Sequence, residues 1–170
     1  MKTDPSLEVL LVEDNEEDAM LMQRAFKHHG LMRPPPIVHD GDEAIDYLLG
    51  RNVYADRIAH PFPSIVILDL KMRRMSGFDV LKWILDHPDY RVIPTIVWTS
   101  SADTRDVKQA FCLGANAYLC KPSSYDTFVE MVGRLLAFWN DCLKPGVEPI
   151  EASCSKLKDR DPFFGAVLER

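Results

Sequence analysis

The sequence has no block of basic residues, no basic helix with interleaved aromatic side chains and no long apolar run. Its formal net charge is −6 at pH 7, so its surface would repel duplex DNA on average, and we expect no nucleic-acid partner. No apolar stretch approaches the roughly 20 residues that cross a bilayer. Residues 1–6 are polar and unlike a signal peptide. We therefore expect a cytoplasmic protein that makes no contact with membranes.

Cysteine pairs at metal-binding or redox spacing are also missing. The four cysteines are Cys112, Cys120, Cys142 and Cys154; they form no CxxC motif, and no histidine stands at a zinc-like interval from any of them. Three of them fall in segments that we predict to be buried helix or strand. We therefore expect reduced thiols that pack as small apolar side chains.

Strand-like and helix-like segments alternate along the 170 residues, whose 46% apolar content suits one domain. The predicted strands are 9–12, 37–38, 64–68, 94–98 and 117–119, and the predicted helices are 15–29, 41–49, 78–86, 103–113 and 123–143. The run 64–68 is short and uniformly apolar, which is typical of a central parallel strand. Five such units predict an α/β fold, a doubly wound five-stranded parallel sheet with helices on both faces.

Several helix ends are marked by polar residues with capping chemistry. Asn15 and Ser123 are placed to cap the first and last helices, and Asp103 with Asp106 has the spacing of a capping box. One face of the last helix is apolar: Phe128, Met131, Val132, Leu135, Leu136 and Trp139. The pattern alone leaves open whether this face belongs to the core or to a dimer interface.

The periodic pattern stops at Lys144, so we divide the chain into a folded domain, 1–143, and a C-terminal tail, 144–170. We expect the tail to be too short to form a separate output domain. Its apolar segment 162–168 is expected to pack on the domain, with docking on a partner as the alternative. The loop 51–63 is long and is a natural place for an insertion.

Polar side chains follow four of the predicted strands at the point where each strand ends. They are Glu13 and Asp14, Asp69, Thr99 and Lys121, after the first, third, fourth and fifth strands. The carboxyl ends of parallel strands share one edge, where open α/β sheets bind ligands, so we expect these side chains to meet. Each alone has an ordinary explanation, as a helix cap or a loop residue, but their joint placement favours a site. Asp69 is expected to lie exposed at the tip of its buried strand.

Three clustered acids favour a divalent cation. Without a cation they would repel one another, and at least one pKa should rise. Mg²⁺ prefers oxygen ligands, so we expect Asp14 and Asp69 to bind it. Glu13 would bind it directly or through a water, and Lys71 would contribute its backbone carbonyl.

The same site has the groups needed to accept a phosphoryl group. Asp69 would be the nucleophile, and the cation would neutralise the incoming charge. Thr99 supplies a hydroxyl and Lys121 an ammonium, which are suitable donors to phosphoryl oxygens. We therefore predict a magnesium-dependent phosphoacceptor site.

These residues resemble the receiver domain of two-component response regulators over residues 7–143. Gly77 stands eight residues after Asp69, Thr99 thirty residues after it, and Lys121-Pro122 begins twenty-two residues after Thr99. The long loop 51–63 is similar to that of stand-alone regulators that partner phytochrome-type kinases. The resemblance implies a flavodoxin-like (βα)5 domain with strand order 2-1-3-4-5.

The resemblance also implies partners and a switch. A histidine kinase or a phosphotransfer protein would phosphorylate Asp69, and the domain would slowly hydrolyse the product. Thr99 and Tyr118 would then move, with Tyr118 turning inward, although a half-buried aromatic residue on an edge strand is the plainer explanation. The signal would leave through the face formed by 103–113, 117–119 and 123–143, which is also a plausible homodimer surface.

Two departures and two alternatives accompany this interpretation. Arg73 stands where the family often has proline, four residues after Asp69, which would make the loop more mobile or bring charge to the kinase interface. Lys71 would either be solvated or contact the phosphoryl group and change its lifetime. A phosphatase like the haloacid dehalogenases would need an acid where Lys71 stands, so that alternative is disfavoured. A degenerate receiver that acts only as a scaffold is disfavoured because the acids, Thr99 and Lys121 are all present.

Overall fold

The computed structural model describes residues 7–31 and 33–142, and the predicted tail lies outside them. The elements are β1 (Val9–Val12), α1 (Glu16–His28), β2 (Ile37–Val38), α2 (Gly41–Leu49), the 3₁₀ helix η1 (Asn52–Tyr54), β3 (Ile65–Leu68), α3 (Gly77–Asp86), β4 (Thr95–Thr99), α4 (Thr104–Cys112), β5 (Ala117–Cys120) and α5 (Tyr125–Asp141). The strands form one parallel sheet in the order β2-β1-β3-β4-β5. The predicted fold class and strand order are confirmed.

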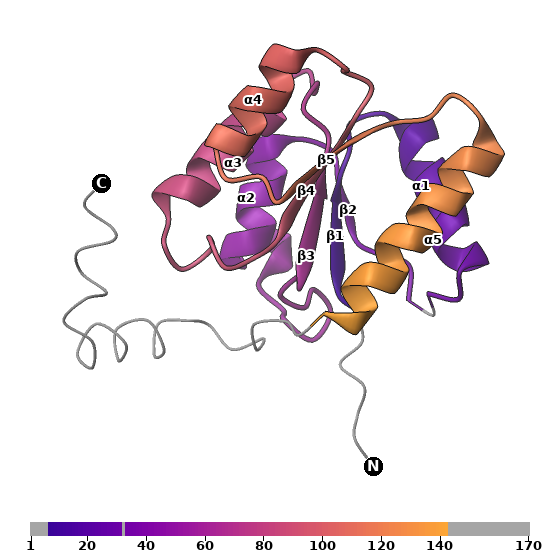
Figure 1. Cartoon of the computed structure of the whole chain (residues 1–170). Coiled ribbons are helices and arrows are strands. Elements are labelled where there is room, and N and C mark those ends of the chain that lie inside the picture. The colour runs from indigo at the N-terminus through magenta and orange to yellow at the C-terminus, as the bar shows by residue number, and fades with distance from the viewer. Residues whose placement is uncertain (1–6, 32, 143–170) are drawn as a thin grey trace.

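The sheet lies between two layers of helices: α1 and α5 cover one face, and α2, α3 and α4 cover the other (Figure 1). Side chains of a strand point alternately to its two faces, so each central strand contributes to two apolar clusters. Leu11 and Ile67 pack under α1 and α5, while Leu10 and Leu68 pack under the other three helices. This two-sided burial explains why β1 and β3 are apolar at every position.

The apolar face of α5 belongs to the core. Phe128, Val132, Leu135 and Leu136 are buried in the cluster that also contains residues of α1. The ring of Phe128 packs edge-on against Trp98, with 5.1 Å between the ring centres. These side chains are therefore unavailable for a dimer interface.

Some local predictions need correction. Asn15 caps α1 as expected, since its side chain accepts the backbone N–H groups of two residues in the first turn. Ser124, and not Ser123, is the N-cap of α5, and it makes no side-chain cap bond. Asp103 caps α4, but Asp106 completes no capping box because its carboxylate accepts a hydroxyl from the preceding loop.

The cysteines are less buried than predicted. Cys112 and Cys120 are exposed and Cys142 is partly exposed, and all three are free thiols. Cys112 lies in the last turn of α4, where Ala110 takes the buried position, and Cys120 ends the edge strand β5. Cys154 lies outside the described residues.

No helix in the part of the chain that the structure describes is long and apolar enough to cross a bilayer.

The long loop 51–63 packs on α2. Tyr54 is buried, and its ring lies 5.0 Å from that of Tyr47 and 5.2 Å from that of His60. The guanidinium of Arg57 donates to the carbonyls of Tyr47 and Leu48 at the C-terminal end of the helix. The Tyr47 carbonyl also accepts the N–H of Gly50, so the loop and the cap residue together supply donors to the carbonyls at the end of α2.

Gly77 lies where the chain folds back on the end of β3. A Cβ atom there would lie 2.2 Å from the carbonyl oxygen of Asp69 and 2.8 Å from Cα of Leu70, and both neighbours are backbone atoms. The N–H of Gly77 also donates to the carbonyl of Leu70 at 3.1 Å. A larger residue could enter only if the loop that carries Asp69 moved.

We expect Gly77→Ala to lower the free energy of unfolding by about 2–3 kcal/mol, as other overpacking changes do, because backbone atoms must shift. Urea unfolding measures this loss. Gly30→Ala is the matched control, because Gly30 has φ +79° with open space around its Cβ position. It should cost only about 1 kcal/mol of backbone strain. Equal losses in the two variants would contradict the proposed clash.

Candidate functional site

Backbone hydrogen bonds continue the parallel ladder past the strand ends and bring the predicted residues together. The N–H of Asp69 donates to the carbonyl of Val12 at 3.0 Å, which sets Asp69 beside the acids that follow β1. The N–H of Lys121 donates to the carbonyl of Thr99 at 2.8 Å. The sheet register therefore places all four strand ends at one site.

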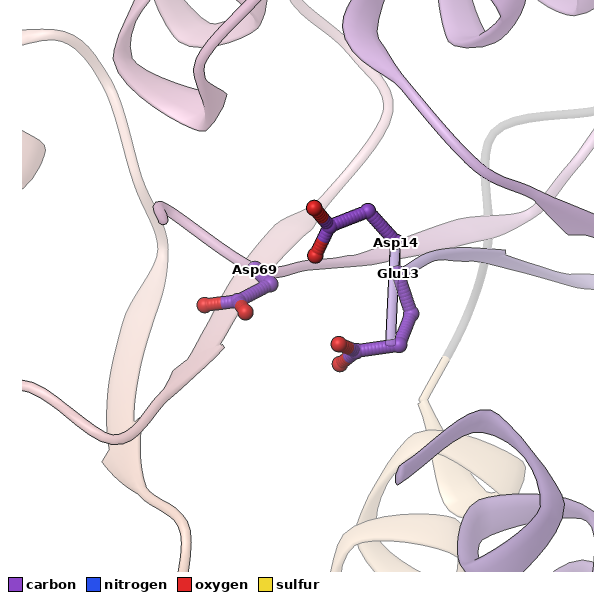
Figure 2. Close-up of side chains that lie close together, drawn as sticks. All are labelled: Glu13, Asp14 and Asp69. Carbon is purple, nitrogen blue, oxygen red and sulfur yellow. The ribbon is translucent and has the colours of Figure 1, made fainter. Parts of the chain in front are cut away.

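Three carboxylates gather around one space at this edge (Figure 2). Glu13, Asp14 and Asp69 each offer an oxygen atom, and these atoms lie within 4.8 Å of one another. Asp69 is only 6% exposed, so the prediction of an exposed tip is wrong. Its two oxygens are covered by Lys121 Nζ at 3.1 Å and by the backbone N–H of Lys71 at 3.3 Å.

Lys121 is the internal cation of the cluster. Its Nζ atom lies 2.7 Å from Glu13 Oε2, 2.8 Å from Asp18 Oδ2 and 3.1 Å from Asp69 Oδ2. Asp18 lies in the first turn of α1 and is not among the residues that the sequence predicts for the site. Its position one turn into the helix that follows the acidic strand end was the available signal.

Burial dominates the electrostatics of Glu13. Removal from water raises the pKa of Glu13 to about 7, although the hydrogen bond from Lys121 lowers it and the charges of Asp69 and Asp18 raise it further. Burial also opposes the charge on Lys121, but its hydrogen bonds to Asp18 and Glu13 outweigh this and raise its pKa. The expectation that at least one acid would have a raised pKa is confirmed, but burial is its largest cause and repulsion between the acids contributes less.

We expect Mg²⁺ to bind more tightly as the pH rises through 7, because the neutral form of Glu13 is a poor ligand and its pKa is raised to about 7. The dissociation constant should be about ten-fold higher near pH 6 than near pH 8, since one proton must leave. Calorimetric titration with MgCl₂ measures both values. A Glu13→Gln variant should bind weakly and lose this pH dependence. Equal affinities of the wild-type chain at the two pH values would contradict the assignment.

The donor set suits a hard cation. It consists of carboxylate oxygens, without thiol or imidazole, which is the chemistry that Mg²⁺ selects. Asp14 Oδ2 accepts the backbone N–H of Arg73 at 3.1 Å and its guanidinium Nε at 3.4 Å. The expected role of the Lys71 carbonyl as a further ligand stays a prediction.

Thr99 and Tyr118 both contact the loop after β4. Thr99 is fully buried, and its hydroxyl accepts the N–H of Ser101 at 3.4 Å. The hydroxyl of Tyr118 donates to the carbonyl of Ser101 at 3.0 Å, and the ring packs against the core cluster of α2, α3 and α4. Burial raises the pKa of Tyr118. The carboxylate of Asp106 accepts the Ser101 hydroxyl, so α4 also holds this loop.

Comparison with known proteins identifies the family. The model of the response regulator receiver domain matches residues 9–133. The probable methanogenesis regulatory protein FilR2 of Methanothrix harundinacea is 34% identical over 136 residues, which span 77% of this chain and 82% of that protein. Response regulator Rcp1 of Synechocystis is 31% identical over 138 residues, 81% of this chain and 92% of Rcp1.

Solved structures agree with the sequence relatives. The phosphorylated cyanobacterial phytochrome response regulator RcpA has a TM-score of 0.73 at 29% identity. The match covers 82% of this chain and 98% of the RcpA chain. The Mn²⁺-bound form of Rcp1 has a TM-score of 0.73 at 31% identity. The match covers 81% of this chain and 98% of the Rcp1 chain. The chain therefore belongs to the family of response regulator receiver domains of two-component systems, and it resembles the stand-alone, phytochrome-associated type.

Proposed function

We propose that this protein accepts a phosphoryl group on Asp69 from a histidine kinase or a phosphotransfer protein, in a reaction that requires Mg²⁺. One observation carries the proposal: an oxygen of Asp69 lies 3.1 Å from Lys121 Nζ, and Asp69 belongs to a cluster of three carboxylates within 4.8 Å. A nucleophile, a fixed cation and a metal-binding acid pair thus converge at one point. The likeness to phytochrome response regulators supports a phytochrome-type kinase as the donor.

The proposed chemistry uses each side chain in one role. A carboxylate oxygen of Asp69 forms a bond to phosphorus, and the P–N bond to the kinase imidazole breaks, so that the imidazole leaves with the bonding electron pair and takes up a proton. Asp14, Asp69 and Glu13 would hold Mg²⁺, which would supply positive charge to the phosphoryl oxygens. Lys121 supplies a second positive charge and remains fixed by its bonds to Glu13 and Asp18. Because Lys121 is already held in place, its charge can act without a rearrangement of that side chain.

The switch is proposed to act through the loop after β4. Thr99 would donate its hydroxyl to the new phosphoryl group, and the loop would follow because Ser101 is bonded to Thr99. Tyr118 is half-buried and already donates to the Ser101 carbonyl, so phosphorylation would act on this hydrogen bond when it moves the loop. A shift between two packings of this loop is the bistable element that such a signal needs.

The output is proposed to be a protein contact on the face formed by α4, β5 and α5. Within the described part of the chain, strand β5 lies at the edge of the sheet and pairs with β4 alone, and its side chains are partly or fully exposed. Phe111, Tyr125 and Phe138 lie on the helices of this face and are 49%, 50% and 62% exposed. Exposed aromatic side chains favour a partner protein or a second copy of the chain.

A phosphatase like the haloacid dehalogenases remains the weaker alternative. It needs an acid two residues after the nucleophile, and Lys71 stands there with an exposed side chain. An ammonium group cannot replace a carboxylic acid that donates a proton and then accepts one. The hypothesis that Lys71 changes the phosphate lifetime stays a prediction.

Incubation with acetyl phosphate and Mg²⁺ tests the proposal. We expect one phosphoryl adduct that forms only with the metal, is labile to base and maps to the peptide that contains Asp69. Rapid turnover of many phosphate esters would instead support the phosphatase. The absence of any adduct with acetyl phosphate and with a panel of histidine kinases would contradict both functions.

A further inference from the structure

The acids of the site divide between two cations that differ in their surroundings. Lys121 is 10% exposed and holds Glu13 and Asp69 from inside the fold. Asp14 is held instead by Arg73, whose side chain is 88% exposed. The outer acid of the site thus has a cation that faces solvent.

Arg73 makes two contacts with a single atom. Its backbone N–H donates to Asp14 Oδ2 at 3.1 Å, and Nε of its guanidinium lies 3.4 Å from the same oxygen. Asp14 is one of the three acids that converge in Figure 2, and its side chain is only 15% exposed. The guanidinium therefore lies beside the space that a metal ion bound to Asp14 would enter.

We infer that Arg73 is a displaceable counter-cation of the metal site and lowers the affinity of this site for divalent cations. The inference rests on the proposed function, in which Asp14 is a metal ligand. A guanidinium and a divalent cation at one carboxylate repel each other, so the guanidinium must withdraw when the metal binds. The side chain is largely solvated, so withdrawal costs little, and the effect is to weaken binding rather than to prevent it.

The loop that carries Arg73 is anchored by its neighbour. The guanidinium of Arg74 lies 3.0 Å from Asp40 Oδ2 and 3.6 Å from Asp42 Oδ2, at the N-terminal end of α2. This pair does not touch the three acids of the site. Arg74 thus keeps the loop attached when the Arg73 side chain leaves, and it offers a control with the same charge on a side chain that is also largely exposed, 71% against 88%.

The test is a calorimetric titration of three chains with MgCl₂ alone: the wild type, Arg73→Gln and Arg74→Gln. Each substitution removes one positive charge, and both leave the backbone N–H of residue 73 in place. We expect Arg73→Gln to tighten Mg²⁺ binding by about three- to ten-fold, since a charge about one contact distance from the metal is removed. Arg74→Gln should change the dissociation constant by less than about two-fold, because its charge is farther away and screened.

Different outcomes of this titration would overturn the inference about Arg73 and the proposed metal site. Equal tightening in both variants would indicate a general charge effect and overturn the inference, as would an unchanged affinity in Arg73→Gln. An Asp14→Asn chain supplies the reference for lost binding. A wild-type chain that binds Mg²⁺ no better than Asp14→Asn would overturn the proposed metal site itself, whatever the arginine variants do.

Discussion

Asp69→Asn is expected to lose phosphorylation by acetyl phosphate, with the initial rate at least about 10³-fold below that of the wild type. A carboxylate oxygen of Asp69 is the nucleophile that forms the new bond to phosphorus. A carboxamide oxygen carries no formal charge and is a far weaker nucleophile, and no acyl phosphate can form at the amide. The substitution keeps the side-chain shape, and the amide oxygen can still accept from Lys121. The loss should therefore lie in the chemistry and leave the fold intact.

Asp86→Asn is the matched control for this variant. Asp86 lies at the end of α3, where its carboxylate pairs with Lys82 at 2.8 Å. The same change of one oxygen to nitrogen should leave phosphorylation at the wild-type rate. Circular dichroism and Mg²⁺ titration on both variants show whether fold and metal site persist. An Asp69→Asn chain that acquires the same base-labile adduct at undiminished speed would refute Asp69 as the acceptor.

The convergence of the site residues could be predicted because topology determines it. Parallel strands joined by crossover helices present their carboxyl ends at one edge. A residue that directly follows such a strand has little freedom to lie elsewhere, as the bond from Asp69 N–H to the Val12 carbonyl shows. The placement of Glu13, Asp14, Asp69, Thr99 and Lys121 at one edge could therefore be predicted from position and residue type, while their chemical roles stay predictions.

Partners contributed by helices and loops could not be predicted in this way. Asp18 reaches Lys121 from the first turn of α1, and its acidic character also suits a helix N-terminus. Arg73 lies in a loop whose path depends on the close approach of Gly77 to Asp69. A one-dimensional pattern gives the direction of neither side chain, because both depend on how separate elements pack.

The burial of individual residues was the least predictable feature. Asp69 is covered because Lys121 and the backbone after β3 close over its oxygens, although strand tips are usually exposed. Cys112 and Cys120 lie in regular elements but point to solvent, since α4 buries only Ala110 and β5 is an edge strand. Membership of a helix or strand therefore does not decide which face a residue occupies.

Lys121→Met is expected to lower the free energy of unfolding by about 3–5 kcal/mol at neutral pH without Mg²⁺, because removing one partner leaves buried carboxylates uncompensated. Lys121 is 10% exposed, and its Nζ atom is shared by Glu13, Asp18 and Asp69. Methionine has a similar length, so most packing is kept. Lys82→Met is the control: its pair with Asp86 is exposed to solvent, so its loss should change the stability little.

The dependence on pH separates charge from packing in this variant. The folded-state pKa of Glu13 is raised from 4.5 to about 7, so between these values the folded chain binds more protons than the unfolded chain, and its stability falls as the pH rises. Lys121 lowers the pKa of Glu13, so its loss should raise this pKa further and extend the fall in stability to higher pH. Urea unfolding should therefore show a small difference between variant and wild type near pH 5 and a large one near pH 8. Saturating Mg²⁺ should reduce the difference, because it supplies the missing positive charge. An equal loss of unfolding free energy at every pH and metal concentration would instead show that Lys121 acts through packing alone.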